Sequence, residues 1–402
     1  MKIILFALAT ALAMTIPAAS AFDLGTPTTD TRSEDDIARG VDQWIVGFYE
    51  MPDIKEGDLY MGERVVSVTP DLTFITVYSL APDALEAKIA LDDNVRYFES
   101  DFNTHSLFYS PNDYYVGHSS NWGMNKIGLP TAWDKTRGST SIKDAHVDSG
   151  RVANHEDLPS SRVYGGWDYY SGDSNPQDTS ACGWHGTHTA GTVGATINNA
   201  KGFPGTAQII IHPLKIFGGG GCYATSTTNL ANALKWGGNN GAHISSNSWG
   251  GGAYSSTLAS AIQYSVDRGV IFVGAAGNGG CSNCVGEPWR SKETVTIIVT
   301  ATTSTDGGAS FNSKGPQTDV SAPGVSIGSS CGPYTNSYCI MSGTSMATPY
   351  VAGVVGLMKT RNPSWTHSTV QSQLKSTALD LGTAGEDDTF GAGRIRANLA
   401  VT

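Results

Sequence analysis

The pattern of apolar and polar residues divides the chain into two regions near residue 105. Beyond it, short apolar runs typical of buried strands alternate with longer segments that suit helices. Strands are predicted at residues 141–148, 208–217, 243–249, 270–274 and 294–302. Helices are predicted at residues 185–197, 226–236, 255–268 and 366–378, and behind Ser345. This alternation predicts an α/β fold of three layers, α/β/α, around a mostly parallel sheet with its site at the carboxyl ends of strands.

The region before residue 105 differs in both pattern and charge. Its predicted strands are residues 44–49, 64–68, 72–80 and 94–99, and its predicted helix is residues 82–91. Residues 22–105 hold 18 Asp and Glu against 6 Lys and Arg, whereas residues 106–402 hold 18 of each kind. The shift predicts a separate small α+β domain. The balanced charge of the larger region argues against a nucleic-acid partner.

The first residues have the pattern of a secretory signal peptide. Lys2 supplies a positive charge, residues 3–14 are apolar, and Ala19-Ser20-Ala21 is a cleavage site of small residues. A membrane anchor is the alternative, but the apolar run is short and no other stretch could span a bilayer. We therefore expect a signal peptide at residues 1–21, a secreted protein and no membrane partner.

All six cysteines lie in the larger region, and an even count in an exported chain favours disulfides. Sequence does not determine their pairing. Proximity favours Cys331–Cys339 and allows Cys281–Cys284, which leaves Cys182–Cys222. The alternative is a zinc site at Cys281-x-x-Cys284, which lacks the second pair that such sites use.

The most reactive-looking serine is Ser345, in the run Gly343-Thr344-Ser345-Met346-Ala347. An uncharged, mostly apolar run follows it as far as Met358 and suits a buried helix. A hydroxyl at the start of such a helix lies beside free backbone N–H groups, which is the geometry of a nucleophile next to an oxyanion site. The alternative is an ordinary Ser or Thr helix cap.

Two further stretches supply acid–base groups. Asp148 ends a predicted strand before Ser149-Gly150, where it can orient an imidazole, although an Asp before Gly is also a common turn. His185 begins the predicted helix and can act as a general base, whereas His188 suits a hydrogen-bonded core position. A metal-binding His pair is the alternative, but it lacks the spacing and the internal Glu of a zincin helix.

A third stretch, Val273-Gly274-Ala275-Ala276-Gly277-Asn278, is a strand that stops on glycine and exposes an amide. Asn278 could donate its N–H to a developing oxyanion together with the N–H of Ser345. An Asn in a left-handed turn is the alternative.

Taken together, these motifs resemble the subtilases, the subtilisin-like serine peptidases, in the order Asp148, His185, Ser345. Ser321-Ala322-Pro323-Gly324 also looks like a family segment, and the resemblance covers about residues 110–400. It implies a serine endopeptidase with Ser345 as nucleophile, His185 as base, Asp148 as its orienting acid and Asn278 as oxyanion donor. No catalytic metal is implied.

The resemblance also implies a binding site for an extended protein or peptide substrate. The expected contacts are Gly219, Gly220, Gly221, Ser248, Trp249, Gly250 and Gly277. Glycines there allow close backbone approach and strand addition, although a glycine run can also be a flexible linker. The candidate pocket walls near Ala275 to Gly279 carry no acid, which favours apolar or aromatic side chains before the cleaved bond. A broad specificity is expected.

Residues 22–108 resemble the family's inhibitory propeptide, which is then a partner of its own peptidase domain at residues 109–402. Self-cleavage is expected near Leu107, Phe108 or Tyr109. A permanent regulatory domain is the alternative. A monomer is expected.

Four further positions bear on the resemblance to the family. Asp157 matches a family calcium ligand and Asn198 lies in the matching loop, which implies a structural calcium site; a solvated Asp is the alternative. His146 and Tyr350 depart from the family pattern. An inactive binding protein on the same fold and a zinc hydrolase are the rival functions, and the complete set of catalytic residues argues against the former.

Overall fold

The computed structural model describes residues 43–101 and 109–402; the predicted signal peptide and the expected cleavage positions Leu107 and Phe108 lie outside these residues. Residues 43–101 form an antiparallel sheet of order β2-β3-β4-β1-β5 with one helix. Its elements are β1 (Gln43–Phe48), β2 (Leu59–Tyr60), β3 (Glu63–Thr69), β4 (Phe74–Tyr78), α2 (Pro82–Ile89) and β5 (Val95–Ser100). Leu85 and Ile89, four residues apart on α2, join Val46, Ile75 and Val77 of the sheet in a separate core.

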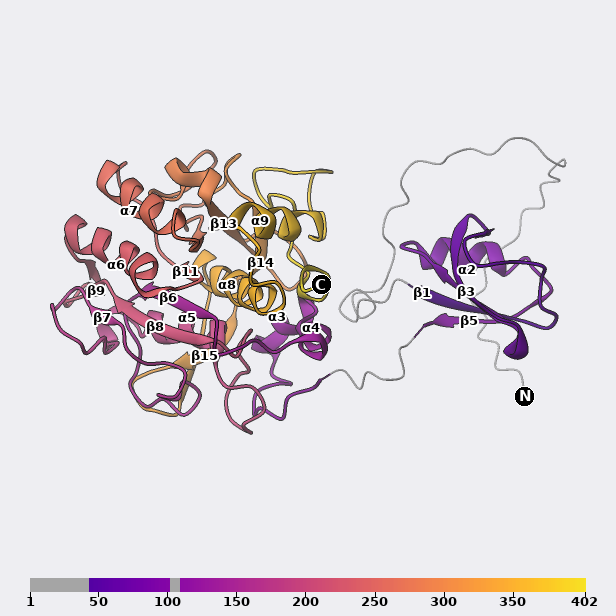
Figure 1. The fold of residues 1–402 in the computed structure, drawn as a ribbon, viewed down its shortest axis with the longest axis horizontal. Helices are drawn as coiled ribbons and strands as arrows, with labels where there is room; N and C mark the ends of the chain where they lie inside the picture. Colours follow the sequence, from indigo (N-terminus) through magenta and orange to yellow (C-terminus); the bar gives the residue numbers. More distant parts are fainter. Residues whose placement is uncertain (1–42, 102–108) are drawn as a thin grey trace.

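The larger unit is built on a seven-stranded sheet of order β14-β13-β12-β11-β6-β8-β7 (Figure 1). Its strands are β6 (Lys143–Asp148), β7 (Trp167–Asp168), β8 (Ile210–Lys215), β11 (Ile244–Asn247), β12 (Ile271–Ala275), β13 (Thr296–Thr302) and β14 (Val320–Pro323). Every pair of neighbouring strands in it is parallel. The predicted α/β fold with a mostly parallel sheet is therefore confirmed.

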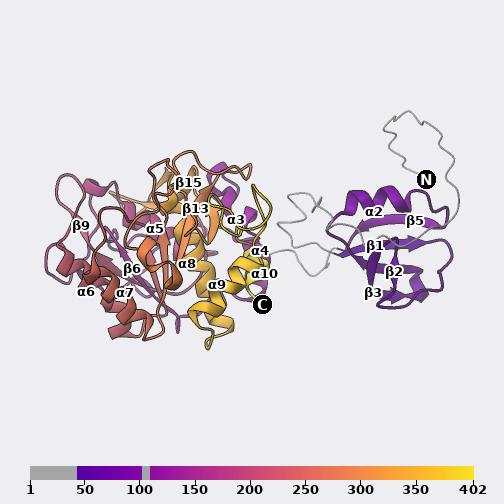
Figure 2. The same cartoon turned by 90° about the horizontal axis from the view of Figure 1, so that it is seen from above.

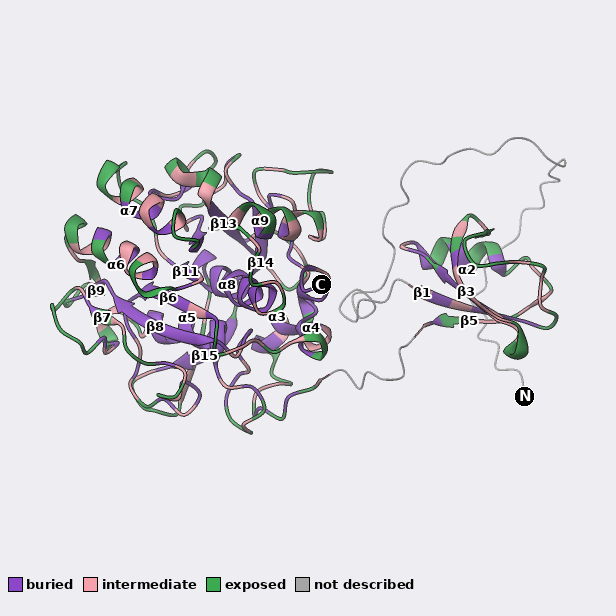
Figure 3. Cartoon of the chain, in the orientation of Figure 1, coloured by how far each residue is buried: buried purple, intermediate pink, exposed green. Residues whose placement is uncertain are grey.

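Helices cover both faces of this sheet because successive strand residues point to opposite sides. Ile271 and Val273 of β12 join the core that contains α5 (His185–Gly194) and α8 (Thr344–Arg361), whereas Phe272 between them packs with α6 (Thr227–Asn240) and α7 (Ser256–Val266). Helix α8 is buried from Thr344 to Lys359 and contacts β11, β12, β13 and β14. Figures 2 and 3 show α8 as the central helix, with the exposed sides of α6 and α7 facing outward.

The remaining elements are short. They are α3 (Trp122–Lys126), α4 (Leu129–Lys135), β9 (Phe217–Gly218), β10 (Tyr223–Ala224), β15 (Ile327–Cys331), β16 (Ser337–Met341), α9 (His367–Ser376) and α10 (Ala397–Ala400). The sequence predicted α9 but not β14 or the β15–β16 hairpin. It also extended the His185 helix to residue 197, whereas α5 ends at Gly194.

Three disulfides join the six cysteines: Cys182–Cys222, Cys281–Cys284 and Cys331–Cys339. This pairing agrees with the prediction from proximity. Of the helices in residues 43–101 and 109–402, none combines the length and the apolar character needed to cross a membrane.

Candidate active site

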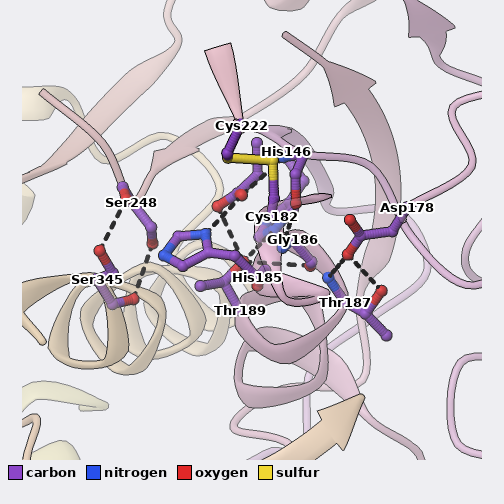
Figure 4. A network of polar contacts seen from close by, with 12 residues as sticks. His146, Asp178, Cys182, His185, Gly186, Thr187, Thr189, Cys222, Ser248 and Ser345 are labelled. Atoms are coloured by element: carbon purple, nitrogen blue, oxygen red, sulfur yellow. Dashed lines mark hydrogen bonds and ion pairs between the residues drawn. A yellow bond between two sulfur atoms is a disulfide. The ribbon is translucent and has the colours of Figure 1, made fainter. Parts of the chain in front are cut away.

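The parallel sheet brings the predicted acid, base and nucleophile to one place. Asp148 is the last residue of β6, His185 is the first residue of α5, and Ser345 is the second residue of α8. A strand's carboxyl end and two helix N-termini therefore meet here, as expected for an α/β fold. Figure 4 shows the ring of His185 directed toward Ser345 and Ser248.

Asp148 and His185 are joined by a short hydrogen bond. Nδ1 of His185 lies 2.7 Å from Oδ1 of Asp148. The Asp148 carboxylate also accepts the N–H of Ser149 at Oδ1 (2.7 Å) and the hydroxyl of Thr189 at Oδ2 (3.0 Å). Since a carboxylate can only accept, Nδ1 carries the hydrogen and the neutral ring keeps Nε2 free to take a proton.

For each residue of this pair, burial and the charge of the partner shift the pKa in opposite directions. Burial alone would raise the pKa of Asp148, but the charge and hydrogen bond of His185 outweigh it and hold the pKa below its ordinary value. Burial alone would lower the pKa of His185, but the charge and hydrogen bond of Asp148 outweigh it and raise the pKa. His185 keeps 27% of its side chain exposed, whereas Asp148 keeps 1%.

Ser345 is held by a reciprocal pair of hydrogen bonds with Ser248. The Ser345 hydroxyl donates to the carbonyl of Ser248 (2.9 Å), and the Ser248 hydroxyl donates to the carbonyl of Ser345 (2.9 Å). In this arrangement the nucleophile's hydrogen bond goes to Ser248 and not to His185. Such catalytic contacts often tighten only when substrate is bound.

Asn278 lies beside the first turn of α8 with its amide held in one orientation. Its side-chain oxygen accepts the backbone N–H of Thr344 (2.9 Å) and the hydroxyl of Thr344 (3.0 Å). Because a backbone N–H can only donate, the atom facing Thr344 must be the oxygen, which leaves the NH₂ group free. Gly277 has φ of 110°, and its N–H reaches the same Thr344 hydroxyl (3.2 Å).

Most of the expected substrate-binding residues lie on two segments, the glycine loop 219–221 and residues 248–250. Gly219, Gly220 and Gly221 are exposed and lead into Cys222, whose disulfide to Cys182 ties this loop to the segment before His185. Trp249 and Gly250 line a cavity of about 160 Å³. The apolar residues Phe217, Leu230, Leu258 and Pro288 complete much of its wall.

One acid, Glu287, also lines this cavity, which lies outside the walls near residues 275–279 that the sequence predicted to be free of acids. Its carboxylate is already engaged by Nε of Arg290 (3.3 Å) and by the N–H of Ser291 (3.3 Å).

The expected calcium residues do not form a complete site. Asp157 is buried, but its Oδ1 accepts from Asn199, whereas the oxygen of Asn198 accepts the N–H of Asn112. Burial is the main cause that raises the pKa of Asp157 to about 6. The charge of nearby Asp113, a residue that the sequence did not indicate, also raises it. One oxygen of each Asp is buried without a hydrogen-bond partner.

The second histidine of the pair is separate from the site chemistry. His188 is fully buried and its Nε2 contacts the carbonyl of Ile327 at 3.0 Å. Burial lowers its pKa to about 4, so the ring stays neutral. Among the described residues no three His, Cys, Asp or Glu side chains gather in a group that could hold a metal.

Sequence reasoning missed the residues that orient the site. Thr189 donates to Asp148, Thr344 holds Asn278, and the Ser149 hydroxyl accepts the N–H of Gly186 at the start of α5. Each is a small polar residue whose partner lies far away in the chain, so no local pattern marks it.

Comparisons with known proteins identify the family of the chain. A sequence model described as the subtilase family matches residues 139–393. The chain is 34% identical to alkaline elastase YaB from Bacillus sp. over 89% of this chain and 91% of that protein. It is 37% identical to thermitase from Thermoactinomyces vulgaris over 73% of this chain and 99% of that one.

Solved structures give the same result. A protease from Pseudoalteromonas arctica aligns with a TM-score of 0.63 and 29% identity, covering 73% of this chain and 98% of that one. Fervidolysin from Fervidobacterium pennivorans, a keratinolytic enzyme related to subtilisin, aligns with a TM-score of 0.64 and 26% identity, covering 90% of this chain and 61% of that one. The chain therefore belongs to the subtilase family and is a serine endopeptidase.

Proposed function

We propose that the chain is a secreted, self-processed endopeptidase that cleaves proteins through an acyl-enzyme on Ser345, with His185 as base and Asp148 as its orienting acid. The observation that carries this proposal is the 2.7 Å bond between His185 Nδ1 and Asp148, in a ring that is directed toward Ser345 (Figure 4). That bond leaves Nε2 as the only ring nitrogen able to take the serine proton.

In the proposed reaction, the Ser345 hydroxyl turns from Ser248 to His185 Nε2. Its oxygen bonds to the substrate carbonyl carbon while the proton passes to Nε2. His185 then returns this proton to the departing amine nitrogen as the C–N bond breaks. Water repeats the sequence on the ester and frees the enzyme. The Asn278 NH₂ group and the N–H of Ser345, which lies in the first turn of α8, would stabilise the oxyanion.

The substrate would add as an extended strand between the glycine loop 219–221 and Ser248-Trp249-Gly250, with Gly277 near the bond that is cut. The mostly apolar wall beside Trp249 favours apolar side chains before the cleaved bond. Glu287 does not overturn this preference because Arg290 and the Ser291 N–H already bind its carboxylate.

Residues 22–108 would act as an inhibitory propeptide. Residues 43–101 have a hydrophobic core of their own, which supports a separate domain. Tyr109 is tied to the larger unit: its N–H donates to Asp134 (3.2 Å), and Arg137 stacks on its ring at 3.5 Å. A boundary between the two units close to residue 109 fits both observations.

A structural calcium ion is proposed at Asp157 and Asp113. Two buried carboxylates with unpartnered oxygens suit a hard cation, which prefers oxygen ligands. The ion would stabilise the fold and take no part in the reaction. Asn198 would not be the calcium ligand that the sequence suggests, because its side-chain oxygen accepts the Asn112 N–H. It would instead help to hold the loop.

Labelling with a fluorophosphonate serine reagent tests the proposal. The purified protein should be labelled at Ser345 and lose its activity in proportion. An inactive binding protein on the same fold would show no labelling, and a zinc hydrolase would be inhibited by chelators but not by the reagent.

A further inference from the structure

A second acid–histidine pair lies behind the candidate triad, at the position where His146 departs from the family pattern. His146 and Asp144 both lie on β6 and are 1% and 0% exposed. Nδ1 of His146 is 3.2 Å from Oδ2 of Asp144. The other ring nitrogen, Nε2, is 2.9 Å from the hydroxyl of Thr189.

Thr189 connects this pair to Asp148. Its hydroxyl lies 3.0 Å from Oδ2 of Asp148, and also 3.1 Å and 3.2 Å from the carbonyls of His185 and Gly186. All three groups only accept, whereas Nε2 of His146 can donate or accept; a Thr189 hydroxyl that gives its single hydrogen to Asp148 therefore accepts from a protonated Nε2. Figure 4 shows His146 on the far side of His185 from Ser345.

The protonation state of the ring decides the direction of the Thr189 contact. Nδ1 donates to the Asp144 carboxylate, which can only accept; with Nε2 also protonated and donating to Thr189, His146 is positively charged. Burial alone would lower the pKa of His146, but the hydrogen bond and charge of Asp144, with the charge of Asp148, outweigh it and raise the pKa.

The residues opposite His146 on the neighbouring strands are neutral. They are Ser246 of β11 and Pro213 of β8. The charged or titratable groups around it are Asp144, Asp148 and His185.

We propose that His146, paired with Asp144, is a positioning residue of the active site that acts on Asp148 through Thr189. In its protonated form it makes the Thr189 oxygen an acceptor and so frees the Thr189 hydrogen for Oδ2 of Asp148, the nearest of its three acceptors, which leaves Oδ1 of Asp148 for His185. Its positive charge also disfavours protonation of His185, because two like charges then share one carboxylate. This inference rests on the proposed triad.

The test replaces the pair together, as Asp144→Val with His146→Val. A single His146→Val change would leave the buried Asp144 carboxylate with the Ser246 N–H (3.1 Å) as its remaining partner, whereas removal of both side chains leaves no unpaired charge at these two positions. Activity against a peptide substrate is measured from pH 5 to 9, with active enzyme titrated by the serine reagent. We expect the acidic limb of kcat/KM to shift to higher pH by about half a unit or more, with KM little changed.

Two further variants test the connection through Thr189. Thr189→Val should shift the same limb, whereas Thr189→Ser, which keeps the hydroxyl, should restore the wild-type profile. The matched control is Thr192→Val, one turn later on α5, whose hydroxyl donates to the His188 carbonyl and does not touch Asp148.

A double variant whose pH profile superimposes on that of the wild type would overturn the inference, as would an unshifted Thr189→Val. Ser345→Ala, assayed in parallel, keeps the two proposals apart. If Ser345→Ala is inactive and the pH profile of the double variant is unshifted, the triad is supported and only the role of His146 is rejected. Full activity of Ser345→Ala would instead reject the triad.

Discussion

Thr344 holds the side-chain oxygen of Asn278 with two hydrogen bonds, from its backbone N–H at 2.9 Å and its hydroxyl at 3.0 Å. The residue that precedes the proposed nucleophile thus also orients the proposed oxyanion donor. The two segments are 66 residues apart in the chain and are joined at the N-terminus of α8. The N-terminus of α8 therefore positions both Ser345 and the side-chain amide of Asn278.

Thr344→Val should weaken this orientation without removing the donor. We expect kcat to fall about tenfold with KM little changed, because one of the two bonds that hold the amide is lost. Asn278→Ala removes the donor itself and should lower kcat by about 10² to 10³, the range known for such a donor in subtilisin. The control is Thr348→Val, one turn later, whose hydroxyl donates only to the Thr344 carbonyl. Steady-state kinetics on a peptide substrate make the comparison, and equal losses in Thr344→Val and Thr348→Val would argue against this role.

The raised pKa of His185 predicts the acidic limit of activity. His185 accepts a proton only when it is neutral, so kcat/KM should fall about tenfold per pH unit below its pKa. Asp148 raises this pKa, so the midpoint should lie above the ordinary histidine value of 6.5. A pH profile of kcat/KM gives the midpoint directly. A midpoint below 6.5 would contradict the assigned pairing.

The Cys182–Cys222 disulfide should affect both stability and substrate binding. It closes a loop of sequence separation 40 and joins the glycine loop to the segment before His185. Replacing both cysteines by Ala should lower the free energy of unfolding by about 4 kcal/mol and raise KM.

The matched control is the Cys331–Cys339 pair, whose sequence separation is 8. Its removal should lower the free energy of unfolding by only about 2.5 kcal/mol and leave KM unchanged. Denaturant unfolding and KM measurements compare the two variants. An unchanged KM in the variant without Cys182–Cys222 would show that this disulfide does not affect substrate binding.

Calcium should stabilise the protein through Asp157. Burial raises the pKa of this carboxyl to about 6, so without an ion the folded state loses stability as pH rises from about 4 to 6 and Asp157 ionises. At about 100 times its Kd, calcium should add about 2.7 kcal/mol and raise Tm by about 5 °C. Asp157→Asn should abolish this rise at pH 8, whereas the exposed Asp267→Asn should keep it. Thermal melts with calcium and with a chelator measure it, and equal Tm values for the wild type in both would reject the site.

The strands and helices that carry the site could be predicted because each has a local pattern. Asp148 ends a short strand before Ser149-Gly150, and an uncharged apolar helix follows Ser345; both elements lie where the sequence predicted them. The short strand β14 and the β15–β16 hairpin were missed. β14 has four residues and ends on a proline, and neither strand of the hairpin shows a clean alternation of buried and exposed positions.

The polar contacts around the site could not be predicted, since they depend on packing between distant segments. His146 was noticed only as an unusual residue, and its partner Thr189 lies 43 residues away on another element. Likewise, Ser345 was expected to face His185, whereas the hydroxyl is bonded to Ser248 from a loop 97 residues earlier. Sequence identifies the reactive groups, and tertiary packing decides their orientation.

The most direct measurement of the central claim is the mass and N-terminal sequence of the secreted wild-type and Ser345→Ala proteins, with casein hydrolysis assayed on each. The account predicts that the wild type begins near residue 109 and cleaves casein. Ser345→Ala should retain residues 22–108 and show no activity. A Ser345→Ala protein that is processed at the same bond without added protease and cleaves casein at the wild-type rate would contradict it.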